Sequence, residues 1–171
     1  MEKNQIDIVR VKLIADKSLY SDVKIETIED AISVIGKELV QCDREIFCVA
    51  NVNSIGQVIN LNIASMGILN TAIIHPREIF KGSILSNAAG IIVMHNHLSG
   101  DIRPSEEDIS TTERLKKAGE IIGIRLLDHI IVGDKYGRYY SFKDDKICEK
   151  KIKSKEKNTY ERWEKNISCA C

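Results

Sequence analysis

Apolar residues along the chain repeat with two different periods, and the shorter period of two predicts strands. Residues 9–13 alternate between apolar and polar side chains, as a half-buried strand does. Apolar runs at 46–52 and 57–63 flank a polar segment that contains Asn53 and Gly56, which predicts a β-hairpin. Further strands are expected over residues 90–97, 124–132 and 138–142.

Segments with a helical period separate these strands. Thr27 has the position of a helix cap, and the apolar residues that follow it fall on one helical face: Ile28, Ile32, Ile35 and Leu39. A second helix is expected from Pro76 to Ala89 and a third from Ser105 to about Gly123. Strands mixed with helices, including a hairpin, predict an α/β fold with a mixed β-sheet covered by helices.

Two histidines one residue apart close the apolar run at 90–97. Alternate residues of a strand point to one face, so His95 and His97 are expected side by side, with Cα atoms about 6.6 Å apart. Asp108 follows in the first turn of the helix that Ser105 is expected to cap. Two imidazoles and a carboxylate are ligands of catalytic zinc, which leaves its fourth position to water. The sequence therefore predicts a Zn²⁺ site formed by His95, His97 and Asp108.

The same residue types also have simpler interpretations. Ser105 and Asp108 fit a capping box, a common helix start that needs no metal. His129 follows Asp128 in a strand-like run, and we expect a hydrogen-bonded structural pair in the sheet; the alternative is a group that orients a metal ligand or lines a cleft. His75 is expected in a loop at a helix start. Neither His129 nor His75 has ligand spacing to the two-histidine motif.

Five stretches of the chain form a recognisable set: residues 95–101, 104–105, 127–133, 75–81 and 139–142. They resemble the RadC-like branch of the JAB/MPN family of metalloproteases, which carries the JAMM motif, over roughly residues 8–143. The resemblance implies a cytidine-deaminase-like α/β/α sandwich. Two departures are visible: Leu98 stands where the family pattern has Pro, and the helix-hairpin-helix segment that precedes this domain in longer family members is not found.

The resemblance also implies a zinc-dependent hydrolase that cleaves a peptide or isopeptide bond. The family mechanism needs a glutamate upstream of the histidines as general base, and the best match is Glu45, at the start of an apolar strand. Zinc lowers the pKa of its bound water to about 7, and a carboxylate in reach can take the proton and later deliver it to the leaving amine. Ser105 is then expected to donate to the oxyanion.

A different class of function is a non-catalytic metal-binding interaction module associated with DNA repair or nucleic-acid metabolism. Lys and Arg number 25 and Asp and Glu also 25, so the net charge gives no support for binding DNA or an anionic membrane. A zinc nucleobase deaminase would need His-x-Glu and Pro-Cys-x-x-Cys motifs, which the chain lacks.

Composition and cysteine usage place the remaining limits. The five cysteines are irregularly spaced, which indicates reduced thiols in a cytoplasmic protein. We find no signal peptide and no apolar run long enough to span a bilayer. With 171 residues in total, residues 1–145 are expected to form one domain and residues 146–171 a charged C-terminal tail.

Overall fold

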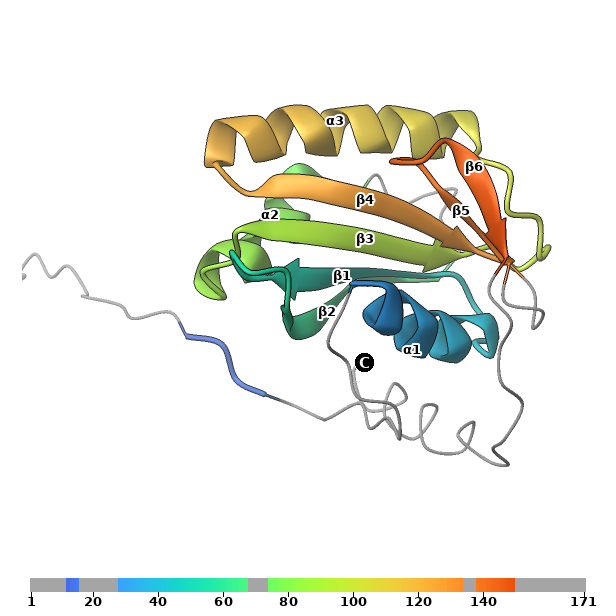
Figure 1. Ribbon diagram of the computed structural model, residues 1–171, viewed down its shortest axis with the longest axis horizontal. Coiled ribbons are helices and arrows are strands. Elements are labelled where there is room, and N and C mark those ends of the chain that lie inside the picture. Colours follow the sequence, from blue (N-terminus) through green and yellow to red (C-terminus); the bar gives the residue numbers. More distant parts are fainter. Residues whose placement is uncertain (1–11, 16–27, 68–73, 134–137, 150–171) are drawn as a thin grey trace, which may run out of the picture.

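In the part of the chain that the structure describes, six strands form one mixed sheet that lies between helices on both of its faces (Figure 1). The computed structural model describes residues 12–15, 28–67, 74–133 and 138–149. The elements in chain order are α1 (Ile28–Val40), β1 (Ile46–Val52), β2 (Val58–Met66), α2 (Pro76–Leu85), β3 (Gly90–Asn96), α3 (Glu106–Ile122), β4 (Arg125–Val132), β5 (Arg138–Ser141) and β6 (Lys146–Glu149). The predicted α/β class with a mixed sheet is confirmed.

The strand order is β2-β1-β3-β4-β5-β6, and among these described strands only β3 and β4 pair in parallel. Parallel neighbours need a crossover connection, and α3 provides it. Because β3 and β4 are central, their buried residues point into two separate cores. The parallel register places His129 beside Val93, two residues before His95.

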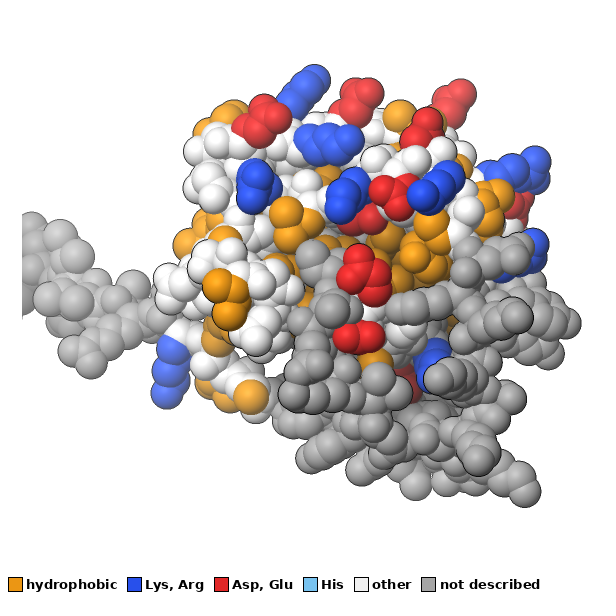
Figure 2. Space-filling view, in the orientation of Figure 1, with side chains coloured by type: hydrophobic (Ala, Val, Ile, Leu, Met, Phe, Trp, Pro, Cys, Tyr) orange, Lys and Arg blue, Asp and Glu red, His pale blue; other side chains and the backbone are white. Residues whose placement is uncertain are grey.

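The two faces of the sheet have different coverings. α1 packs on one face over an aliphatic core that includes Leu39, Ile92 and Met94. α2 and α3 pack on the other face, where Phe80 and Leu115 contact residues of β1 and β3. The outer surface of α3 shows positive and negative side chains interspersed (Figure 2). Among the described helices, none has the length and hydropathy needed to cross a membrane.

Several element boundaries differ from those expected. The second helix ends at Leu85 rather than Ala89, because the Ser86 hydroxyl bonds the carbonyl of Gly82 and Asn87 adopts a positive φ of 52°. Strand β2 runs on to Met66.

Two expectations for the ends of the chain are affected as well. Of the strand expected at 9–13, residues 9–11 lie outside the described residues, as does Thr27, while Lys12 and Leu13 are in no strand. At the other end, β6 pairs with β5 at residues 146–149, so the sheet continues four residues into the segment expected to be a charged tail. Lys143, Asp144 and Asp145 make the turn that returns the chain to β5. Residues 150–171 lie outside the described residues.

Candidate metal centre

The end of β3 and the first turn of α3 bring together His95, His97 and Asp108. The Nε2 atoms of His95 and His97 lie 3.0 Å apart. Asp108 Oδ1 lies 3.1 Å from His95 Nε2, and Asp108 Oδ2 lies 3.4 Å from His97 Nε2. His95 and Asp108 are buried, whereas the His97 side chain keeps 16% of its surface exposed. The three groups thus converge at one point that solvent reaches beside His97.

The loop between the histidines and α3 is held from both ends. The ring of His97 donates from Nδ1 to the carbonyl oxygen of Asp101 over 2.7 Å, since a carbonyl can only accept. Ile102 is buried against Gly133, where even a Cβ atom would collide with its side chain. The close approach at Gly133 therefore lets the loop reach back over the sheet.

Ser105 caps α3 and binds Asp108 in both directions. The backbone N–H of Ser105 donates to Asp108 Oδ2 at 2.8 Å and its hydroxyl at 2.6 Å, while the hydroxyl accepts from the Asp108 N–H at 3.1 Å. The capping box expected from the sequence is confirmed. Its consequence for the site is that one carboxylate oxygen is already held in place by the helix cap.

His129 enters the cluster from β4. Its Nε2 lies 2.9 Å from His95 Nδ1, and its Nδ1 lies 2.6 Å from the hydroxyl of Thr112 on α3. Atoms of His95, Asp108 and His129 that can bind a metal all lie within 4.8 Å of one another. The described residues therefore contain two overlapping donor sets, which share His95 and Asp108.

The expected hydrogen-bonded pair of Asp128 and His129 is present, but it is made by the backbone N–H of the histidine and not by its ring. Asp128 accepts a hydrogen bond from the backbone N–H of His129 at 2.7 Å, and also from the Ser141 hydroxyl and the Lys143 N–H. The ring of His129 turns away to bind His95, because successive residues of a strand point to opposite faces. The alternative, a ring that orients a neighbouring ligand, fits these contacts.

Two phenylalanines enclose the buried histidine pair. Phe47 stacks on His95 with ring centroids 5.6 Å apart, and Phe142 stacks on His129 at 4.7 Å. Burial, reinforced by the neighbouring charge of His95, holds the pKa of His129 well below its usual value. His129 is thus a neutral ring in an apolar surrounding, with hydrogen-bond partners for both nitrogens.

The charges nearer the solvent behave differently. The hydrogen bond to Asp108 raises the pKa of His97 against the effect of partial burial, and the charge of Glu45 adds to the rise. Burial opposes ionisation of Asp108, but hydrogen bonds from His95 and His97 hold the pKa of this carboxyl far below its usual range. Asp108 is therefore a carboxylate at neutral pH.

Glu45 is half-buried and lies immediately before β1, close enough for its charge to act on His97. Asn96, the last residue of β3, brackets it. The Asn96 side chain accepts from the Ile46 N–H at 2.8 Å and donates to the Arg44 carbonyl at 3.0 Å. The two peptide units that flank Glu45 are thereby tied to the strand that carries His95.

Sequence reasoning missed Asn96 and Thr112 as parts of this arrangement. Thr112 is one helical turn after Asp108, a spacing that places both on one face of α3, so a signal was present. The signal for Asn96 was its position between the two histidines, which directs it to the opposite face of the strand.

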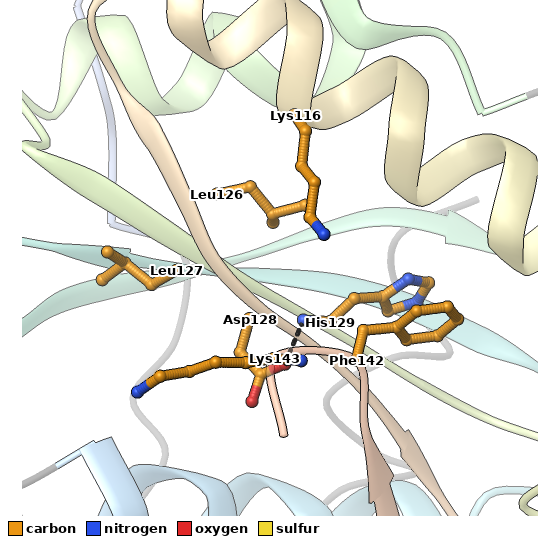
Figure 3. A pocket seen from close by; sticks show the side chains of 7 residues that line it. All are labelled: Lys116, Leu126, Leu127, Asp128, His129, Phe142 and Lys143. Carbon is orange, nitrogen blue, oxygen red and sulfur yellow. Dashed lines mark hydrogen bonds between the residues drawn. The ribbon is translucent and has the colours of Figure 1, made fainter. Parts of the chain in front are cut away.

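A pocket of about 250 Å³ borders the cluster on the far side of His129. In Figure 3, Lys116 reaches from α3 toward this pocket, and Phe142 lies against the ring of His129. The pocket adjoins the convergent groups only through His129, so it is separated from the Nε2 atoms of His95 and His97.

The fold is of the α/β class, and two imidazoles and a carboxylate meet at one strand end of its mixed sheet. These groups form a candidate metal centre. The sequence model of the RadC-like JAB domain matches residues 25–147. The chain therefore belongs to the RadC-like JAB domain family, and the mixed sheet and three helices of its described residues agree with a JAB/MPN-like fold.

Curated relatives share this part of the chain. A UPF0758 protein of Clostridium beijerinckii is 42% identical over 128 residues, which are 75% of this chain and 55% of the relative. A UPF0758 protein of Caldanaerobacter subterraneus is 46% identical over 116 residues, covering 68% and 49% of the two chains. One from Pelobacter propionicus is 50% identical over 105 residues, covering 61% and 45%. The chain thus spans about half the length of the curated relatives it matches.

Proposed function

We propose that this chain is a zinc-dependent hydrolase of the JAMM type that cleaves a peptide or isopeptide bond. The observation that carries the proposal is the convergence of His95 Nε2, His97 Nε2 and the Asp108 carboxylate at separations of 3.0 to 3.4 Å. Four tetrahedral ligands about 2.0–2.1 Å from zinc are about 3.4 Å apart, so these separations suit that ion.

The hydrogen-bond chemistry of the donor set supports a bound cation. His97 donates its Nδ1 proton to the Asp101 carbonyl, so the Nε2 atom of the neutral ring carries a lone pair. That lone pair faces the ionised Asp108 and the ring of His95. Groups that only accept hydrogen bonds repel one another unless a proton or a metal ion lies between them. Nitrogen and oxygen donors together are a set that zinc accepts.

His97 suits the third ligand position better than His129 does. Both ring nitrogens of His129 are already occupied, one by His95 Nδ1 and the other by Thr112. His129 also meets His95 on the Nδ1 side of the ring, whereas Asp108 meets it at Nε2. We therefore assign His95, His97 and Asp108 as the ligands.

The remaining residues supply the proton transfers. Bound zinc would contribute a water molecule whose pKa is lowered to about 7. Glu45, whose charge acts on His97, would take the proton from this water and later deliver it to the leaving amine. The Ser105 hydroxyl would stabilise the negative charge that develops on the substrate carbonyl oxygen. In the described arrangement that hydroxyl binds Asp108, so it would have to turn toward the substrate.

The same proposal includes a reducing, cytoplasmic setting. Cys48 and Cys148, which lie within the described residues, are free thiols. Structural disulfides are rare in the cytoplasm, and free thiols suit that compartment.

The test is hydrolysis by the zinc-loaded protein of a panel of peptides and isopeptide-linked conjugates, with Glu45→Gln as the matched variant. We expect the variant to keep its zinc and to lose activity by about 10²–10⁴-fold, the usual contribution of a general acid–base group. Equal activity in both proteins would remove Glu45 from its role. A zinc-loaded protein that cleaves nothing in the panel would favour the non-catalytic binding module instead.

A further inference from the structure

We propose that Thr112 and His129 are positioning residues that fix the tautomer and ring orientation of His95, so that His95 always presents a bare Nε2 to the metal. This inference rests on the ligand role proposed for His95. It assigns a purpose to two buried polar residues that belong to neither the ligands nor the proton-transfer groups.

The chain of hydrogen bonds begins at the backbone carbonyl of Asp108, whose hydrogen-bonding role is fixed. The carbonyl oxygen of Asp108 can only accept, and the Thr112 hydroxyl lies 2.6 Å from it, so the single hydroxyl hydrogen is placed there. The same hydroxyl lies 2.6 Å from His129 Nδ1. Because its hydrogen is already used, the hydroxyl must accept at this second contact. His129 therefore carries its proton on Nδ1.

The hydrogen bond between His129 and His95 extends this constraint to the proposed metal ligand. A neutral imidazole has one N–H, so the Nε2 atom of His129 is an acceptor. It lies 2.9 Å from His95 Nδ1, which must then donate. His95 thereby keeps a proton on Nδ1, which leaves its Nε2, 3.1 Å from Asp108, as the nitrogen that can bind the metal. One hydroxyl on α3 thus determines the tautomer of a histidine on β3.

Packing holds this chain of hydrogen bonds in place. We call it the relay; it runs from Thr112 through His129 to His95. Thr112, His129 and His95 are 3%, 0% and 0% exposed, so water does not compete for these hydrogen bonds. Phe47 stacks on the His95 ring and Phe142 on the His129 ring, which opposes rotation of either imidazole. The relay also starts and ends at the metal site, because Thr112 binds the backbone of the residue whose carboxylate is a proposed ligand.

The contacts predict what happens when the hydroxyl is removed. Without an acceptor at Nδ1, His129 can carry its proton on Nε2 and donate it to His95 Nδ1. His95 then holds its own proton on Nε2, where it points at the metal position. Zinc must displace that proton and reverse both tautomers before it can bind. Partners that orient a metal-binding histidine typically contribute 10–100-fold to metal affinity.

The experiment compares Thr112→Val, which keeps the shape and loses the hydroxyl, with Thr112→Ser, which keeps the hydroxyl. Zinc affinity is measured by competition with a chelator, and ¹⁵N chemical shifts of the histidine rings are measured in the metal-free full chain. We expect Thr112→Val to bind zinc about 10–100-fold more weakly and to shift His95 toward the Nε2–H tautomer. Thr112→Ser should resemble the unmodified protein in both measurements.

The ring spectra of the unmodified protein are a second, independent test that needs no variant. Protons on Nδ1 of both His95 and His129 support the relay, and an Nδ1 without a proton on either ring overturns it. Unchanged affinity and tautomers in a folded Thr112→Val protein also overturn it. An unmodified protein that shows these tautomers but binds no zinc would refute the proposed hydrolase while leaving the relay intact.

Discussion

The two faces of the central sheet are built by the same strands but do different work. On β3, Ile92 and Met94 face α1 within an aliphatic core, whereas Ile91 and Val93 lead to His95 on the side of α2 and α3. Both faces are buried, and the second holds the connected cluster of histidines, Asp108 and Thr112. Buried polar groups cost free energy unless their partners are nearly ideal. The α1 face therefore stabilises the sheet, and the α3 face gives up part of that stability to hold the candidate metal centre.

Shortening one leucine on each face of the sheet should have the largest effect and should distinguish the two faces. Leu39 on α1 and Leu115 on α3 are both fully buried. Replacing either by Ala should lower the free energy of unfolding by about 2–5 kcal/mol, the usual range for a buried leucine. Leu39→Ala should leave the zinc affinity of the folded protein unchanged, whereas Leu115→Ala should weaken it, because α3 carries Asp108 and Thr112.

Chemical denaturation combined with zinc titration would distinguish the two variants. A loss of zinc affinity in Leu39→Ala as large as in Leu115→Ala would show that the two faces are not independent.

Asn96 is a buried polar residue at the end of β3, on the face opposite the His95 ring. Its replacement should have the next largest effect on stability. Asn96→Ala removes the partners of the Ile46 N–H and the Arg44 carbonyl, and an unsatisfied buried group costs about 1–3 kcal/mol. We expect this loss in thermal or urea unfolding. Asn53→Ala, in the exposed turn between β1 and β2, is the control for losing an asparagine that bonds backbone groups. If Asn96→Ala were as stable as the unmodified protein, the hydrogen bonds of Asn96 on either side of Glu45 would not contribute to stability.

Lowering the pH should weaken zinc binding gradually, because His97 becomes protonated. Its pKa is raised above the ordinary 6.5 by the bond to Asp108, so the metal-free protein takes up a proton there at a higher pH than an isolated histidine would. Zinc and this proton compete for Nε2. Below the raised pKa the zinc affinity should therefore fall by about tenfold per pH unit, and above it the affinity should level off.

Zinc titrations from about pH 5 to about pH 8 would check this slope. His75→Asn is a suitable control, because His75 caps α2 away from the centre and Asn is also a good cap. A zinc affinity that stays constant over this range would remove His97 from the ligand set.

The least effect is expected from thiol reagents on the α1 face. Burial raises the pKa of the Cys48 thiol, and the side chain is 1% exposed. Only a thiolate in contact with solvent reacts readily. Cys48 should therefore stay unmodified by iodoacetamide in the folded protein, while the partly exposed Cys148 of β6 reacts. Peptide mass mapping would show this, and rapid labelling of Cys48 would mean that the aliphatic face opens.

Much of the candidate site was accessible from sequence because it depends on local geometry. The spacing of His95 and His97 needs only the two-residue period of a strand, and Asp108 needs only the start of the next helix. His129 needed information that the sequence does not display. Its place depends on the parallel register of β3 and β4, including the irregularity beside Ile91 and Ile92.

The missed strand has a similar explanation. Strand β6 is only four residues long and mixes charged and apolar side chains, so no period distinguishes it from a polar tail. It is held by pairing with β5, a contact made only once the chain has folded. Local signals thus predicted most of the elements, whereas pairing between strands decided the rest.

The measurement that tests the central claim most directly is metal content, determined by elemental mass spectrometry on protein purified without a chelating column. Matched His97→Ala and Glu45→Gln variants should be measured beside it. The account predicts about one zinc ion per chain, lost in His97→Ala and retained in Glu45→Gln. Protein that binds no zinc even after incubation with the ion at neutral pH, or that keeps it without His97, would contradict it.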